Sequence, residues 1–296
     1  MTEHATYAHV ATDPSRPDPA RPAPLVSPDW LAQALRSPRV RALDASWHLP
    51  NAGRDARAEY LAGHLPGAAF FDIDALSDAS SDLPHMLPDA QDFAQAMGAL
   101  GIADDMTLVV YDSVGLFSAP RAWWTLRVFG ARDVRVLDGG LPAWRAAGLP
   151  LESGEAARAP AHFRARLEPG AAANMDDVRA ALADGSAQVA DARSAERFAG
   201  KAAEPRPGLP AGHMPGARNL PMAQVLAQGR MKAPQDVLAA FVQAGLDPDR
   251  QIITSCGSGV TAAVLNLALA CAGKPQPRLY DGSWTEWASR GGAVET

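Results

Sequence analysis

Short apolar runs alternate with amphipathic stretches through the second half of the chain. Residues 251–255 (QIITS) are a run of β-branched residues, which is typical of a short strand. Before them, residues 233–246 (APQDVLAAFVQAGL) place apolar side chains such as Val237 and Phe241 at the spacing of an amphipathic helix. After them, residues 259–273 (GVTAAVLNLALACAG) predict a long, buried apolar helix. Short buried strands separated by helices favour a parallel sheet with helices on its faces.

The same alternation extends on both sides of this region. Residues 176–185 (DDVRAALADG) predict a short helix that ends at Gly185, and residues 187–193 (AQVADAR) predict a short buried strand. Residues 277–283 (PRLYDGS) hold the next strand, and residues 284–290 (WTEWASR) a short helix. The predicted fold class is therefore α/β.

Segments of the first half recur in the second half. Three pairs match in the same order and at nearly one offset: GHLPGAAFFDI (63–73) with GHMPGARNLPM (212–222), LVVYD (108–112) with IITSC (252–256), and VLDGGLPAW (136–144) with LYDGSWTEW (279–287). These matches predict two tandem domains of one fold, over residues 25–150 and 171–296. Residues 151–170 are rich in Ala, Arg and Pro and predict a linker, whereas the proline-dense residues 1–24 predict a flexible tail.

Composition excludes several classes of protein. The 296 residues carry a net charge of −6, without a run of Lys or Arg, which argues against binding to nucleic acid. No apolar run has the length needed to span a bilayer, and the N-terminus lacks the apolar segment of a secretory signal. Cys256 and Cys271 lie at opposite ends of one predicted helix, too far apart for a disulfide, and two thiols at this spacing do not suggest zinc. We expect a monomeric cytoplasmic protein without a metal or cofactor.

Cys256 lies at the hinge between a predicted strand and the apolar helix that follows. Ligands in open α/β sheets bind at the carboxyl ends of strands. Gly257-Ser258-Gly259 is expected to begin the helix, where unpaired N–H groups and the helix dipole stabilise a thiolate. The two glycines allow the backbone to direct several N–H groups at one anion. The alternative is that Cys256 is a small core residue that happens to end a strand. Cys271, late in the apolar helix, is interpreted as inert packing.

The repeat provides an internal comparison for this loop. Asp112 stands in the first half where Cys256 stands in the second, so one half keeps a nucleophile and the other does not. This difference predicts a single site in the cleft between the domains. Cysteine phosphatases need an arginine six positions after the cysteine to clamp the phosphoryl group, but here that position is Ala262. Phosphoryl transfer is therefore disfavoured.

The repeated Gly-His-x-Pro-Gly segments, the LDGG and YDGSWTEW segments and the SCGSGVTA loop together resemble the two-domain rhodanese family. The resemblance covers nearly all of the chain after residue 24. Within that family, the CGSGVTA loop is similar to that of 3-mercaptopyruvate sulfurtransferases. Thiosulfate enzymes resemble each other in having Arg and Lys just after the cysteine, where this chain has Gly257 and Ser258.

The resemblance implies a ping-pong sulfurtransferase that needs no cofactor. The Cys256 thiolate would take sulfur from 3-mercaptopyruvate as a persulfide, release pyruvate, and pass the sulfur to a thiol, to thioredoxin or to cyanide. Loop N–H groups can hold a persulfide anion, so we expect four loop residues to contribute to the substrate site: Gly257, Gly259, Val260 and Thr261.

Side chains outside the loop are assigned by the same resemblance. Arg197 and Arg206 would bind the carboxylate and keto groups, because a guanidinium binds a carboxylate with two hydrogen bonds. Ser258 would form a relay with His64 and with an acid, for which Asp55 is our choice. His64 could instead pin its own turn, as His213 would in the other half.

Other residues have interpretations that do not need the resemblance. Arg193 is expected to form a structural ion pair near Asp191. Asp138 and Asp281 are expected to form turns. Trp144, Trp284 and Trp287 are expected in the core or in the cleft walls.

Two other functions remain open at this point. One is the thiosulfate:cyanide reaction on the same fold, which the uncharged loop disfavours. The other is a non-catalytic sulfur carrier or partner-binding module, which the intact cysteine loop disfavours.

Overall fold

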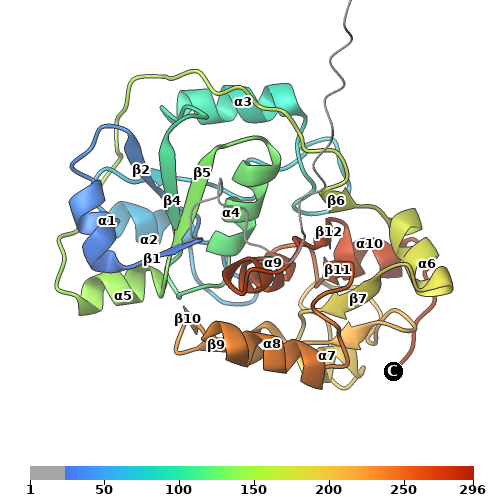
Figure 1. The fold of residues 1–296 in the computed structure, drawn as a ribbon. Helices are drawn as coiled ribbons and strands as arrows, with labels where there is room; N and C mark the ends of the chain where they lie inside the picture. The colour runs from blue at the N-terminus through green and yellow to red at the C-terminus, as the bar shows by residue number, and fades with distance from the viewer. Residues whose placement is uncertain (1–23) are drawn as a thin grey trace, which may run out of the picture.

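The computed structural model describes residues 24–296 and contains two five-stranded parallel sheets (Figure 1). The first sheet has the strand order β1-β5-β4-β2-β3. Its strands are β1 (Leu25–Val26), β2 (Val40–Asp44), β3 (Ala69–Phe70), β4 (Thr107–Tyr111) and β5 (Asp133–Leu137). All of its strand pairs are parallel, as the buried apolar runs predict.

The second sheet repeats this order, element by element, as β6-β12-β11-β7-β8. Its strands are β6 (Ala172–Ala173), β7 (Gln188–Asp191), β8 (Arg218–Asn219), β11 (Ile252–Ser255) and β12 (Arg278–Tyr280). A separate antiparallel pair consists of β9 (Leu226–Ala227) and β10 (Arg230–Met231). The predicted fold class, two tandem α/β units of one topology, is confirmed.

Helices cover the faces of both sheets. Those of the first half are α1 (Pro28–Ala34), α2 (Ala56–Ala62), α3 (Ala90–Ala99), α4 (Ala119–Val128) and α5 (Gly140–Ala146). Those of the second half are α6 (Met175–Asp184), α7 (Ala195–Phe198), α8 (Pro234–Gln243), α9 (Ala262–Cys271) and α10 (Ser283–Ser289), with a 3₁₀ turn at Met222–Gln224. Gly185 ends α6 as predicted, since its φ of 70° suits the left-handed cap of a helix.

The two halves share one hydrophobic core, with α4 and α9 packed directly against each other between the sheets (Figure 1). Residues 262–269 of α9 are all buried, which explains why this helix is apolar on every side. Trp123 of α4 is also fully buried in this core. Since α4 follows β4 and α9 follows β11, this packing brings the loops that begin with Asp112 and Cys256 toward the interface.

The segment between the halves runs along the first half. Residues 151–170 contain no helix or strand. Glu152 exchanges two backbone hydrogen bonds with His64, and Phe163 is buried edge-on against Phe93, with ring centroids 5.7 Å apart. Of the tail predicted over residues 1–24, residues 1–23 lie outside the described part of the chain. Within residues 24–296, no helix has the length and apolar character needed to cross a bilayer.

Candidate functional site

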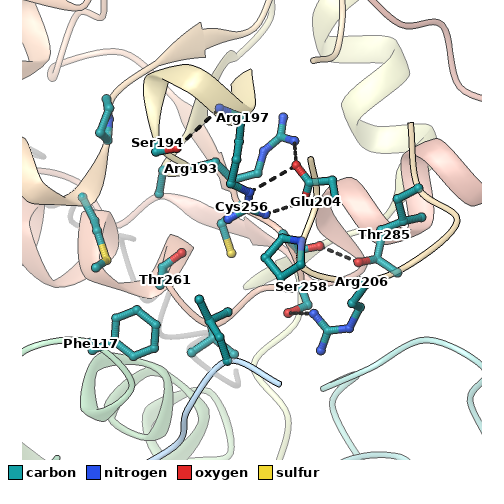
Figure 2. Close-up of a pocket in the computed structure, with 18 of the residues that line it drawn as sticks. Phe117, Arg193, Ser194, Arg197, Glu204, Arg206, Cys256, Ser258, Thr261 and Thr285 are labelled. Carbon is teal, nitrogen blue, oxygen red and sulfur yellow. Dashed lines mark hydrogen bonds and ion pairs between the residues drawn. The ribbon is translucent and has the colours of Figure 1, made fainter. Parts of the chain in front are cut away.

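A pocket of about 200 Å³ lies between the halves, with Cys256 in its wall (Figure 2). The first half contributes Trp47, Leu49 and Phe117, and the second half contributes the cysteine loop and several charged side chains. The pocket is therefore in the cleft between the domains, where the comparison of the two loops predicts the site. The second half lines it with Ala192, Arg193, Ser194, Arg197, Glu204, Pro205, Arg206, Leu209, Pro221, Met222, Ala223, Cys256, Gly257, Ser258, Val260, Thr261 and Thr285.

Cys256 follows β11 directly, but the helix after it begins later than the sequence suggests. α9 begins at Ala262, and residues 257–261 form an irregular loop. Gly259 has a φ of 78°, which is incompatible with a right-handed helix at that position. Gly259 also lies outside the pocket lining, whereas Gly257, Val260 and Thr261 line the pocket.

The loop is held by its carbonyl groups. Cys256 O accepts from Trp284 N at 3.0 Å, and Gly257 O accepts from the N–H and the hydroxyl of Thr285 at 2.9 and 2.7 Å. Gly259 O faces the guanidinium of Arg121 at 3.4 Å. Among the described residues, none accepts a hydrogen bond from the N–H groups of residues 257–261. The loop therefore offers several unpaired donors beside the thiol, as an anion site requires.

The equivalent loop of the first half already holds an anion. Asp112 is fully buried, and its carboxylate accepts hydrogen bonds from five backbone N–H groups at 2.7–3.0 Å. The donors are Val114, Gly115, Phe117, Ser118 and Ala119. Burial raises the pKa of Asp112 above its ordinary value, and the N–H groups of Ala119, Phe117, Val114 and Ser118 act in the opposite direction. The loop after this strand is thus built to surround a negative group.

A chain of hydrogen bonds leads from the cysteine loop into the first half. Ser258 Oγ lies 3.0 Å from Nδ1 of His85, and Nε2 of His85 lies 2.9 Å from Asp74 Oδ1. Arg206 Nη1 donates to Ser258 Oγ at 3.1 Å. With the imidazole proton on Nε2, Arg206 donates to Ser258 Oγ, the Ser258 hydroxyl donates to His85 Nδ1, and His85 Nε2 donates to the Asp74 carboxylate.

Asp74 is maintained as an anion by its neighbours. The hydrogen bond from His85 lowers the pKa of Asp74 below its ordinary value, and Trp47 and Arg206 act in the same direction. Trp47 Nε1 lies 3.2 and 3.1 Å from the two oxygens of Asp74, and its ring packs edge-on against His85, with centroids 4.9 Å apart. Trp47 thereby connects the pocket wall to this pair.

The sequence-based choice of His64 and Asp55 for the relay is wrong. Nδ1 of His64 bonds to Tyr60 O at 2.9 Å, and its ring stacks on Tyr60 with centroids 4.2 Å apart. Asp55 caps α2 by accepting from Ala58 N at 3.0 Å. In the second half, His213 bonds to Phe198 O at 2.9 Å in the same manner. Both Gly-His-x-Pro-Gly histidines therefore pin their own turns, which is the alternative interpretation of the sequence.

Sequence reasoning missed His85 because it belongs to no repeated motif. The sequence offers only an indirect signal, that His85 takes the place of Gly229 in the other half. In the structure, its φ of 62° is unusual for a residue other than glycine. Such strained positions are enriched at functional sites.

Arginine side chains surround the rest of the pocket. Arg197 Nε contacts Glu204 Oε1 at 3.2 Å, and its Nη2 forms an ion pair with the other oxygen of Glu204 (Figure 2). Glu204 also receives Arg193 Nη1 at 2.8 Å, and Arg193 forms the predicted structural ion pair with Asp191 at 2.6 Å. A Cβ on Gly257 would lie 2.9 Å from Arg197 Nη2, so this glycine leaves room for the guanidinium over the loop.

Arg206, the second predicted substrate-binding arginine, is half-buried in the pocket wall. Desolvation lowers its pKa below the ordinary arginine value, whereas the neighbouring Cys256 and Asp74 act to raise it. An arginine remains protonated under such conditions, so it presents a fixed positive charge to the pocket.

Several further residues have structural roles. Trp144 and Trp284 are fully buried, and Trp287 is 4% exposed, which places all three in the core. Cys271 lies inside α9, and burial raises the pKa of its thiol to about 12. Within residues 24–296, no cluster of three or more His, Cys, Asp or Glu side chains could hold a metal ion.

Comparisons with known proteins agree with this architecture. A model of the rhodanese-like domain matches residues 27–147 and 174–290. The chain is 47% identical over 266 residues to the 3-mercaptopyruvate sulfurtransferase of Escherichia coli (strain K12), covering 90% of this chain and 95% of that protein. It is 46% identical over 273 residues to the human protein of the same name, covering 90% and 92%.

A solved structure matches along almost its whole length. This is the crystal structure of SseA from Escherichia coli, described as a 3-mercaptopyruvate sulfotransferase with the rhodanese fold. The TM-score is 0.83 at 45% sequence identity, and the match covers 89% of this chain and 99% of that chain.

Proposed function

Because the chain belongs to the rhodanese family, we propose that it is a sulfurtransferase that takes sulfur from 3-mercaptopyruvate through a persulfide on Cys256. One observation carries the proposal: the Cys256 thiol lies in a small pocket whose wall contains unpaired loop N–H groups and the arginines Arg197 and Arg206. A site of this kind suits a small keto acid with a negative charge.

The substrate binds through its oxygen atoms. Its carboxylate pairs with Arg197, whose guanidinium is already oriented over Gly257 by Glu204. Its keto oxygen accepts from Arg206, which lies beside Ser258. These two anchors place the thiol carbon between them, with its sulfur toward Cys256. Because both anchors are arginines held by neighbours, little side-chain entropy is lost on binding.

The first half-reaction then proceeds at the sulfur atom. The Cys256 thiolate attacks the substrate sulfur, a new S–S bond forms, and the C–S bond breaks with its electron pair on C3 of pyruvate. The proton of the substrate thiol moves to C3 and completes the methyl group. The products are the Cys256 persulfide anion and pyruvate, so charge and protons balance. The loop N–H groups stabilise the anion on Cys256 before and after the transfer.

Ser258, His85 and Asp74 move the proton in this step. Of these three residues Ser258 lines the pocket, and His85 is in position to accept the proton of its hydroxyl. Asp74 stabilises the imidazolium that forms, because it is an anion in contact with Nε2. Arg206 donates to Ser258 Oγ and thereby favours the alkoxide, which takes the proton of the substrate thiol. The re-formed Ser258 hydroxyl then gives a proton to C3 and regains one from His85, so that both residues end the step as they began it.

The second half-reaction transfers the outer sulfur to an acceptor. A thiol RSH reacts with the persulfide anion to give RSSH and returns the Cys256 thiolate. Small thiols, thioredoxin and cyanide are the acceptors that we propose, with the enzyme acting as a monomer in the cytoplasm and without a cofactor.

A comparison of sulfur donors tests the proposal. Pyruvate release from 3-mercaptopyruvate should exceed the thiosulfate:cyanide rate, because Gly257 and Ser258 provide no cationic side chain for the thiosulfate dianion. Cys256→Ser should abolish both rates. Intact-mass analysis without acceptor should show the gain of one sulfur on the native protein and none on Cys256→Ser. A faster thiosulfate rate would favour the thiosulfate enzyme, and the absence of any sulfur gain would favour a binding module.

A further inference from the structure

Two aspartates at equivalent repeat positions link the two halves of the molecule. Asp281 of the second half accepts from Leu87 N of the first half at 2.7 Å, and Arg121 Nη1 lies 2.7 Å from its other oxygen. Asp138 of the first half accepts from Met231 N of the second half at 3.1 Å and pairs with Arg230 Nη1 at 3.4 Å. We call these contacts the Asp281 clasp and the Asp138 clasp.

The clasps are related by the internal repeat. Asp138 and Asp281 follow β5 and β12, where the sequence predicts only turns. Leu87 and Met231 precede α3 and α8 by the same number of residues. Each aspartate thus receives a backbone N–H from an equivalent residue of the opposite half and a guanidinium from a non-equivalent one, Arg121 on α4 or Arg230 on β10.

The two clasps differ in burial and in what else they touch. The side chains of Arg121 and Asp281 are 4% and 6% exposed, whereas those of Arg230 and Asp138 are 46% and 24% exposed. Arg121 also donates to the carbonyl of His85 and to that of Gly259. A single guanidinium therefore contacts the backbone of the relay histidine, the backbone of the cysteine loop and the Asp281 carboxylate.

The conformation of His85 explains why such support is needed. Its φ of 62° lies in the left-handed region, which is unfavourable for a residue with a Cβ. Without a fixed carbonyl, rotation of this backbone would move the imidazole away from Ser258, because the ring is attached at the strained residue. Arg121 holds that carbonyl, and Asp281 holds both Arg121 and the N–H of Leu87 two residues later.

We propose that the Arg121–Asp281 ion pair is a positioning device that sets His85 against Ser258 across the interface between the halves. The proposal rests on the relay in the proposed function and adds two residues that do not touch the substrate. Asp74 and Arg121 contact His85 directly, Arg206 faces it through Ser258, and Asp281 acts on it through Arg121. The Asp138 clasp makes the same kind of interdomain contact without a relay, which makes it the matched control.

The first experiment compares Asp281→Asn with Asp138→Asn. Both variants keep an oxygen for the backbone N–H and lose the charge opposite the arginine. Asp281→Asn should lower kcat on the order of tenfold to a hundredfold with KM within about twofold, since the relay is misplaced while the substrate arginines are intact. Asp138→Asn should leave kcat within about twofold of the native value. Equal effects on kcat would overturn the proposal.

A double-variant cycle shows whether the effect passes through His85. In a His85→Gln background, Asp281→Asn should lower kcat by less than about twofold, because the group that it positions is already absent. Full additivity of the two losses would overturn the proposal. Arg121→Lys serves if Asp281→Asn does not fold, since lysine keeps the charge but lacks the planar fork that reaches several acceptors. It should reproduce the loss of kcat, and native kcat in Arg121→Lys would overturn the proposal.

A measurement without substrate separates this proposal from the proposed function. Imidazole ¹⁵N NMR, with His85 assigned by His85→Gln, should show altered His85 nitrogen shifts in Asp281→Asn and unchanged shifts in Asp138→Asn. Unchanged shifts in Asp281→Asn would overturn the positioning role even in an active enzyme. Native protein that releases no pyruvate would overturn the proposed function whatever the NMR result.

Discussion

His85 in the first half and Gly229 in the second are 144 positions apart, as are Asp112 and Cys256, and both have a left-handed backbone, with φ of 62° and 74°. The backbone of Gly229 lies against Gly115, and a Cβ added to Gly115 would be 2.7 Å from Gly229 O. Over the cysteine loop of the second half, the corresponding position is filled by the imidazole of His85 from the first half, which contacts Ser258. The loop after β4 is thus covered by the backbone of Gly229, whereas the loop after β11 is covered by the side chain of His85.

His85→Gln should lower kcat for pyruvate release about a hundredfold, because the Ser258 hydroxyl loses its proton acceptor. His64→Gln should leave kcat within about twofold and reduce stability instead, since His64 supports only its own turn. Steady-state kinetics and thermal unfolding of both variants check this pair. A larger loss of kcat in His64→Gln than in His85→Gln would restore the assignment made from sequence.

Gly257→Ala should raise KM for 3-mercaptopyruvate about tenfold with little change in kcat. A rise in KM of about tenfold is the loss of binding expected when one hydrogen bond to a charged group is weakened. The added Cβ would lie 2.9 Å from Arg197 Nη2, so the guanidinium must shift away from the substrate carboxylate. Gly63→Ala is a suitable control, because its Cβ would meet its nearest atom at 3.6 Å, an ordinary contact. Unaltered KM in Gly257→Ala would argue against Arg197 as the carboxylate anchor.

Asp112→Asn should lower the free energy of unfolding by about 2–4 kcal/mol, although Asp112 takes no part in the reaction. Whichever way the amide is turned, at least two of the five N–H groups that Asp112 accepts would face an NH₂ group instead of an oxygen. Denaturant titration measures the loss. Asp176→Asn, at an aspartate whose side chain is 87% exposed, should cost far less. Equal stability of the two variants would mean that the first-half loop does not require an anion.

Iodoacetamide at pH 8 should modify Cys256 and leave Cys271 unmodified in the folded protein. Alkylation requires the thiolate, and with a pKa of about 12 only about one Cys271 thiol in 10⁴ is ionised at that pH. Peptide mapping by mass spectrometry checks the sites. Cys271→Ala should label at the native rate, and preferential labelling of Cys271 would contradict this account of the two thiols.

The parts of the site that were predictable from sequence are those encoded locally. Cys256, Ser258 and the glycine beside the thiol follow one another in the chain, and the repeat shows which half keeps the nucleophile. Arg197 and Arg206 could be named from the resemblance, and the structure places both in the pocket. The α/β architecture followed from the alternation of apolar runs, because the period of a strand or helix is a local property.

The relay partner was not predictable because it depends on a contact between residues far apart in sequence. His85 meets Ser258 across 173 positions, and the distance is set by packing between the halves, which no periodicity reports. His64 and His213 are the more conspicuous candidates in the sequence because they stand in repeated motifs. Each is there because its imidazole bonds to a backbone carbonyl and holds its own turn. The helix after Cys256 also begins later than expected, because the backbone at Gly259 takes a left-handed conformation. Glycine permits this conformation but does not require it, so the sequence alone does not predict it.

The buried carboxylate of Asp112 bears on how sulfur can be gained and lost at Cys256. In the proposed cycle, the side chain after β11 is a thiolate, then a persulfide anion, then a thiolate again, so its charge is constant while its mass and length change. Asp112 shows that the equivalent loop folds around a different chemical group, a buried carboxylate that accepts hydrogen bonds from backbone N–H groups. The first-half loop therefore does not need sulfur at this position, only a side chain that accepts backbone N–H groups. Because the charge on the Cys256 side chain is the same with and without the outer sulfur, electrostatic forces do not drive a conformational change of the loop between the two forms.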